Sequence, residues 1–143
     1  MMVANILATK GRSVTTASQA NTISDICTVL AEKKIGAVVV LGDDERIAGI
    51  VSERDIVRAF ALNGAAALDQ AVSTVMTADV VACHEGDTIN DVMGKMTEGR
   101  FRHVPVTEND HLVGLVSIGD VVKAKIAQIE ADAEQLRSYI ASA

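Results

Sequence analysis

The sequence consists of two copies of one pattern, in which eight residues recur in the same order. Asp25, Val38, Val40, Gly49, Val51, Ser52, Asp55 and Val57 return as Asp91, Val104, Val106, Gly114, Val116, Ser117, Asp120 and Val122. The offset is 66 residues as far as Val106 and 65 from Gly114 onward, so the deletion falls in a polar stretch, where a loop tolerates it. Since half of 143 residues is marginal for independent folding, we expect the halves to share one core.

Both copies predict the same order of elements, namely strand, helix, strand, strand and helix. In the first copy we expect these at residues 14–16, 22–33, 37–41, 47–51 and 52–63, with Thr22 as an N-cap and Gly64 as the final stop. In the second copy we expect them at residues 80–82, 88–97, 103–107, 112–116 and from Ser117 onward. Residues 65–76 are expected to form a largely helical linker.

The composition narrows the class of protein. Hydrophobic residues make up 49% of the chain, yet it has no Trp, two Phe and one Tyr. Such a core must be aliphatic, which suits sheets covered by helices and predicts an α+β fold. No apolar run approaches the roughly 18 residues that a membrane span requires, and residues 1–12 lack the features of a secretory signal. We therefore expect a cytoplasmic protein with no membrane insertion.

Nothing in the sequence is typical of an active site. It has no Ser/His/Asp order, no metal-ligand cluster, no glycine-rich phosphate loop and no paired carboxylates outside the repeat. Cys27 and Cys83 are not equivalent in the two copies and show no metal-binding spacing, so we expect free thiols. We therefore expect no catalysis, no catalytic cofactor and no metal. A net charge of −6 also argues against nucleic-acid binding, which requires a basic face.

Three strings carry a family resemblance. Gly49-Ile50-Val51-Ser52-Glu53-Arg54-Asp55 closes the first copy, Gly114-Leu115-Val116-Ser117-Ile118-Gly119-Asp120 closes the second, and Arg100-Phe101-Arg102-His103-Val104-Pro105-Val106 precedes it. Together with the repeat, they resemble a tandem pair of cystathionine β-synthase (CBS) domains, called a Bateman module. The resemblance covers about residues 3–125. It places the first domain at residues 3–64, the linker at 65–76, the second domain at 77–125 and a helical extension at 126–143.

The resemblance implies two clefts around a pseudo-two-fold axis that hold adenosine-containing ligands. It places Asp55 and Asp120 where family members bind the ribose hydroxyls, and a carboxylate can accept both hydrogen bonds of a diol. Ser52 and Ser117 begin helices whose free N–H groups favour a phosphate. The extended segments that would line the adenine contain, in the two copies, Thr15 and Thr16, and Val80 and Val81.

The same two Asp residues have a structural interpretation. Ser52-x-x-Asp55 and Ser117-x-x-Asp120 are also capping boxes, in which the carboxylate bonds back to the start of its helix. Recurrence does not separate the alternatives, because both copies need a helix start. Both roles stay open, and capping by the Ser residues is compatible with ribose binding by the Asp residues.

The basic residues of the two copies are complementary and not duplicated. Arg102 and His103 align with Gly36 and Ala37, whereas Arg54 aligns with Gly119. Arg54, Arg102 and His103 could therefore converge on an anion between the copies. Alternatively, Arg54 is solvated and Arg102 pairs with Glu98 on the preceding helix. Pro105 has Val39 as its counterpart, a departure from the family pattern, so we expect one good site and one weak site.

The C-terminal segment predicts a long helix with a heptad seam. Val122, Ile126, Ile129, Ala133, Leu136 and Ile140 alternate steps of four and three. This pattern favours a homodimer, and packing against the chain's own body is the alternative. The function we expect is regulatory: binding of AMP, ATP or NAD(H) as a ligand, with control of an effector enzyme or transporter. A nucleotide-free dimerisation or protein-docking module is the other possibility.

Overall fold

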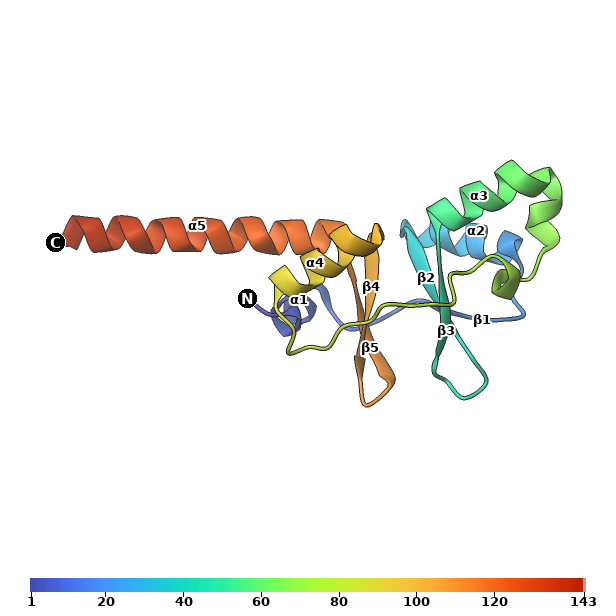
Figure 1. The fold of residues 1–143 in the computed structure, drawn as a ribbon, viewed down its shortest axis with the longest axis horizontal. Coiled ribbons are helices and arrows are strands. Elements are labelled where there is room, and N and C mark those ends of the chain that lie inside the picture. Colours follow the sequence, from blue (N-terminus) through green and yellow to red (C-terminus); the bar gives the residue numbers. More distant parts are fainter. Residues whose placement is uncertain (143) are drawn as a thin grey trace.

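The computed structural model describes residues 1–142 and confirms an α+β fold with a long C-terminal helix (Figure 1). The order of elements is α1 (Val3–Lys10), β1 (Thr16–Ser18), α2 (Ile23–Lys33), β2 (Ala37–Leu41), β3 (Ile47–Ser52), α3 (Glu53–Asn63), the 3₁₀ helices η1 (Gly64–Asp69) and η2 (Val72–Thr74), α4 (Ile89–Gly99), β4 (His103–Glu108), β5 (His111–Ser117) and α5 (Ile118–Ser142). Within these residues no helix is both long and apolar enough to cross a bilayer.

The repeat persists in the register of the two sheets. In the first half β1 pairs with β2 in parallel and β2 pairs with β3 antiparallel, whereas in the second half β4 pairs with β5 antiparallel. Val38 lies opposite Val51, and the equivalent residues Val104 and Val116 also lie opposite each other. In both hairpins the register shifts at the same point, after Val40 and after Val106. Equivalent residues of the two copies therefore occupy equivalent positions in the two hairpins.

The prediction of a strand at residues 80–82 is wrong. These residues belong to no strand, and only Cys83 forms a bridge, a parallel one to Val106 that matches the pair Ala17 and Val40 of the first half. Two hydrogen bonds make this bridge, from Cys83 N to Pro105 O (2.9 Å) and from Thr107 N to Cys83 O (2.9 Å). The first strand also begins later than expected, at Thr16 and not at residue 14.

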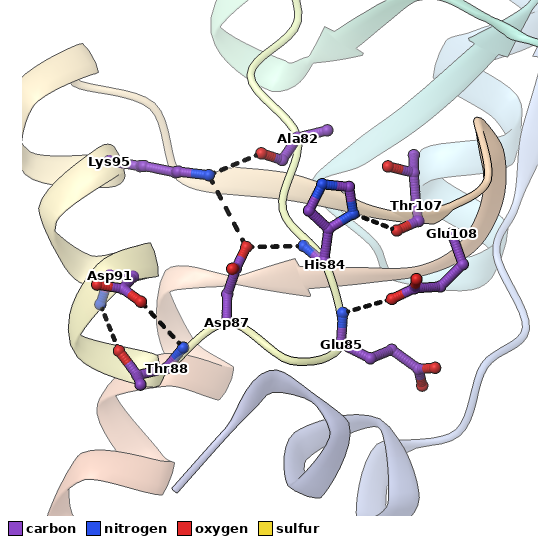
Figure 2. A network of polar contacts seen from close by, with 9 residues as sticks. All are labelled: Ala82, His84, Glu85, Asp87, Thr88, Asp91, Lys95, Thr107 and Glu108. Atoms are coloured by element: carbon purple, nitrogen blue, oxygen red, sulfur yellow. Dashed lines mark hydrogen bonds and ion pairs between the residues drawn. The ribbon is translucent and has the colours of Figure 1, made fainter.

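Side chains replace the missing strand ladder beside Cys83 (Figure 2). Lys95 Nζ donates to Ala82 O at 2.9 Å and lies 3.9 Å from Asp87 Oδ2, which accepts from His84 N at 2.8 Å. His84 Nδ1 lies 2.8 Å from Thr107 O. Polar side chains here supply partners for backbone groups that a strand ladder would otherwise pair. The segment therefore stays extended without becoming a strand.

The expectation of one shared core is wrong, because each half has its own apolar cluster. The first cluster is formed by α2, β2, β3, α3 and η2, and its members are Ile23, Ile26, Leu30, Val38, Val40, Val51, Ile56 and Val72. The second cluster combines α4, β4, β5 and α5 with α1, which the sequence analysis did not predict. Val3 and Leu7 of α1 are fully buried there. The second half is completed by a helix that precedes the first half in the chain.

The helix α5 leaves the body after its first turns (Figure 1). Val121 is its one fully buried residue, and Ile118 and Ala124 pack partly against the second cluster. The seam residues Val122, Ile126, Ile129, Leu136 and Ile140 are 43–64% exposed. Packing of this seam against the chain's own body, the alternative left open above, is therefore contradicted.

Candidate functional site

A cleft of about 510 Å³ lies between the two halves. Its wall is formed by the junction of β3 and α3, by Thr77 and residues 79–81 at the start of the second half, by residues 99–103 from the end of α4 to the start of β4, and by the junction of β5 and α5 at residues 117–119. Both halves contribute, and the volume falls in the range of small-molecule sites, roughly 300 to 1,000 Å³. The cleft is therefore large enough for a ligand of nucleotide size.

Asp55 lies at the start of α3 and lines this cleft. Its Oδ2 atom accepts from Ser52 N at 2.9 Å and from Ser52 Oγ at 3.1 Å, which is the capping interaction. Its Oδ1 atom accepts from the exposed Thr77 hydroxyl at 3.3 Å. One carboxylate oxygen is thus committed to the helix, whereas the other has a long, exposed bond that a ligand hydroxyl could replace.

Asp120 is the repeat counterpart of Asp55, but it does not line the cleft. Its Oδ2 atom accepts from Ser117 N at 2.9 Å and from Lys10 Nζ at 2.6 Å, and Lys10 also donates to Leu115 O at 2.8 Å. Burial alone would raise the pKa of Asp120, but the bonds from Lys10 and Ser117 together lower it. Asp120 therefore both caps α5 and pairs with the end of α1.

Four arginines surround the cleft, two from each half: Arg54, Arg58, Arg100 and Arg102. Arg54 Nη1 donates to Arg100 O at 3.2 Å, so these residues meet across the boundary between the halves. Arg102 forms no ion pair with Glu98 in the part of the chain that the structure describes. The cleft thus concentrates guanidinium groups in a protein whose net charge is −6, a suitable setting for an anion.

His103 lies at the junction of the two copies. A Cβ atom on Gly36 would lie 3.3 Å from the His103 ring, so the small residue of the first copy makes room for the large one of the second. Burial, followed by the charges of Lys10 and Arg102, lowers the pKa of His103 below its ordinary 6.5, while Glu53 and Asp120 oppose this. The ring is therefore mainly neutral at pH 7.

The structure brings together part of the predicted site. Eight predicted residues line the cleft: Ser52, Arg54, Asp55, Val80, Val81, Arg102, His103 and Ser117. Four do not: Thr15, Thr16, Pro105 and Asp120. Pro105 is buried in β4 against Leu115, and Thr15 accepts a bond from Val39 N at 3.4 Å beside β1.

Several residues that line the cleft were not predicted from the sequence: Gly36, Arg58, Thr77, Asp79, Arg100 and Phe101. Two of them had a signal. Arg58 follows Arg54 by one helical turn, and Arg100 precedes Arg102 by two residues in the quoted family string. The structure also shows no group of His, Cys, Asp and Glu suited to a metal ion within residues 1–142.

Comparison with known proteins matches this chain to the CBS domain family model over residues 4–62 and 72–127. A CBS-domain containing protein of Agrobacterium tumefaciens has a crystal structure that is 49% identical, with a TM-score of 0.84, and the match covers 87% of this chain and 92% of that one. The CBS domain pair of protein MJ0100, solved with 5′-methylthioadenosine and S-adenosyl-L-methionine, is 23% identical with a TM-score of 0.80, over 90% and 98% of the chains.

Among curated proteins, the mitochondrial CBS domain-containing protein CBSX3 of Arabidopsis thaliana is 28% identical over 146 residues. That match covers 96% of this chain and 71% of CBSX3. Other A. thaliana relatives are much longer, and this chain spans only 22% of the protein CBSCBSPB2.

Proposed function

The chain belongs to the CBS domain family, and we propose that it is a regulatory module that binds an adenine nucleotide in the cleft between its two domains. The observation that carries this proposal is the placement of Asp55 and four arginines around one cleft of about 510 Å³. In chain order we place the domains at residues 3–64 and 77–125, joined by residues 65–76, with residues 126–143 as a helical extension. The helix α1 lies in the first of these ranges but packs in the core of the second domain. Ala143 lies outside the described residues.

The adenosine part of the ligand is supported by the two kinds of surface in the cleft. Asp55 Oδ1 offers an acceptor for a ribose hydroxyl, and its present partner Thr77 holds it at 3.3 Å. Val80, Val81 and Phe101 supply apolar surface for a base. Both ligands in the structure of protein MJ0100 contain adenosine, which supports the same ligand class here.

The phosphate part is supported by the charges. The lining includes four arginines against three carboxylates, Glu53, Asp55 and Asp79. Methylthioadenosine would leave the arginines without an anionic partner, whereas AMP, ADP, ATP or NAD(H) would supply one. The start of α3 also lines the cleft, and the positive end of its helix dipole favours an anion there. S-adenosylmethionine offers the arginines a single carboxylate, whereas a nucleotide offers the larger charge of a phosphate group, so we favour a nucleotide.

Calorimetric titration and thermal melting with AMP, ADP, ATP, NAD(H), methylthioadenosine and S-adenosylmethionine test the proposal. At least one nucleotide should bind and raise Tm, since about 2.7 kcal/mol is gained at a hundredfold excess over Kd. Chromatography of the recovered nucleotide should show that it is unchanged, as a non-catalytic module requires. If no nucleotide shifts Tm at millimolar concentration, the proposal fails. If only methylthioadenosine binds, which has no anionic group, the role of the arginines is wrong.

We propose further that the protein is a homodimer held through α5 and that it acts on an effector enzyme or transporter. The exposed seam of α5 supports the dimer. A nucleotide-free docking module is the second candidate, supported by Val57 and Leu62 of α3, which are 67% and 77% exposed. A protein that binds none of the nucleotides above and still forms dimers would favour this second candidate.

A further inference from the structure

The exposed seam of α5 carries a charge pattern on its two sides that depends on the direction of pairing. The steps of four and three place Ile126, Ala133 and Ile140 at heptad position a, and Val122, Ile129 and Leu136 at position d. The flanking e positions are then Lys123, Glu130 and Arg137, and the g positions are Lys125, Asp132 and Tyr139. These flanks alternate in sign along the helix.

A parallel, in-register pair of these helices brings opposite charges together. In that arrangement a g residue faces the e residue five positions later on the other helix. Lys125 would face Glu130 of a second copy, and Asp132 would face Arg137 of a second copy. Two-fold symmetry repeats each pair, so four attractive contacts flank the seam and none of these g–e contacts is repulsive.

An antiparallel pair with the same overlap brings like charges together. The register that uses the whole seam sets Val122 against Ile140 and Ile129 against Ala133. In antiparallel pairs e faces e and g faces g. Glu130 would then face Glu130, Asp132 would face Asp132, and Lys123 would face Arg137. Like charges at such positions disfavour the arrangement and thereby select the partner's direction.

From this pattern we propose that α5 pairs with α5 of a second copy as a parallel, in-register, two-stranded coiled coil. The inference rests on the proposed homodimer and adds its direction and register. The contacts that these side chains make within one chain do not prevent it. Lys125 donates to Asn90 Oδ1 at 3.1 Å and Arg137 donates to Glu134 Oε2 at 3.5 Å, both exposed and easily exchanged.

Disulfide trapping tests the direction, because only a parallel pair places identical seam residues side by side. Under mild oxidation, Leu136→Cys should give a covalent dimer. Ser138→Cys, on the outer face of the same turn, is the matched control and should not, and the parent protein controls for Cys27 and Cys83. Mixing tagged Ile126→Cys with untagged Leu136→Cys should give no mixed disulfide. A mixed product would show antiparallel pairing and overturn the inference.

Charge reversal provides a second, independent test on the full-length chain. In the parallel coil Arg137→Glu faces Asp132, so the dimer Kd should rise roughly tenfold, and adding Asp132→Lys should restore it. In the antiparallel register Arg137→Glu would instead face Lys123 and tighten the dimer, which would overturn the inference. If none of these changes affects the dimer, the proposed homodimer stands but the coiled coil of α5 is refuted. If the parent protein is a monomer, both proposals are refuted. Nucleotide titration reports separately on the cleft.

Discussion

Asp55 and Asp120 are equivalent in the repeat but differ in what their carboxylates contact. Asp55 lines the cleft, whereas Asp120 is paired with Lys10 at 2.6 Å. We predict that Asp55→Asn weakens nucleotide binding by about 1.5 to 3 kcal/mol, the range for a hydrogen bond to a charged group, or roughly tenfold to a hundredfold in Kd. Calorimetry measures this change, and Tm should move little, since Asn keeps a capping oxygen.

Asp120→Asn is the matched control for that measurement. It should leave nucleotide affinity near that of the parent and lower stability by about 0.5 to 1 kcal/mol, because a partly exposed ion pair with Lys10 is lost. If both variants bind nucleotide like the parent while melting at lower temperature, the two carboxylates act only as helix caps. The assignment of Asp55 to the ligand would then be refuted.

His103 predicts a pH dependence of stability. Its pKa in the folded protein is lowered, so the folded state binds its proton less readily than the unfolded state, whose His titrates near 6.5. The contribution of the neutral ring is therefore complete above that pH and is lost as the pH falls from 6.5 toward the folded pKa. Urea unfolding at pH 7.5 and 5.5 should show a smaller drop for His103→Gln than for the parent. Equal drops in both proteins would contradict this.

The residues of the cleft show where sequence reasoning ends. The motif positions Ser52, Asp55 and Arg102 were predictable because they belong to strings that recur or that characterise the family. The partner of Asp120 was not predictable, since Lys10 is 110 residues away in the chain and reaches Asp120 through the docking of α1. Equivalent positions in a repeat therefore predict where the backbone lies better than they predict which residues the side chains contact.

At the level of elements, we expect Gly→Ala substitutions to destabilise the protein at Gly49 and Gly114, which are equivalent in the repeat, and to stabilise it at Gly94. A Cβ at Gly49 would lie 2.5 Å from Met76 Sδ and 2.8 Å from Thr77 O, and one at Gly114 would lie 2.7 Å from Leu7 Cδ2. We predict that Gly49→Ala and Gly114→Ala each lower the free energy of unfolding by about 1 to 3 kcal/mol through overpacking. The larger loss is expected at Gly49, where a backbone oxygen is in the way.

Gly94→Ala on α4 is the control, because nothing lies within 4 Å of its added Cβ. A helix-interior Gly replaced by Ala gains about 0.5 to 1 kcal/mol. Denaturant unfolding of the three variants measures these changes on one scale. If all three variants lose the same stability, close packing does not explain why glycine is present in β3 and β5.

The elements that the sequence predicted well are those with strong local signals. Thr22 and Thr88 cap α2 and α4 with side chains that accept from Asp25 N and Asp91 N, as their Thr-x-x-Asp patterns indicate. The helix α1 lacks such a signal, because Met2 is its N-cap and eight residues are too few for an isolated helix. Its stability comes from burying Val3 and Leu7, which no local pattern could reveal.

At the scale of the whole molecule, each half contributes a segment that contacts the other half. The helix α1 begins the chain yet completes the core of the second half, and Lys10 at its end reaches Asp120 at the start of α5. The start of the second half in turn pairs with the first half, because Thr77 N donates to Ile50 O at 2.8 Å and Ile50 N donates to Thr77 O at 2.9 Å. The cleft is lined by both halves, so its shape depends on how the halves meet, an arrangement that suits a regulatory module.

The same scale gives a last prediction, that dimerisation and ligand binding are separable. Removing residues 127–143 deletes Ile129, Leu136 and Ile140, each worth on the order of 1.5 to 3 kcal/mol if buried by a partner. It leaves the cleft intact, since no cleft residue lies beyond Gly119. Light scattering at tens of micromolar should show a dimer for the full chain and a weaker dimer or monomer for the truncated one, with nucleotide affinity unchanged. If the truncated protein remains fully dimeric, the dimer interface lies not on α5 but on the body of the protein, where Val57 and Leu62 are exposed.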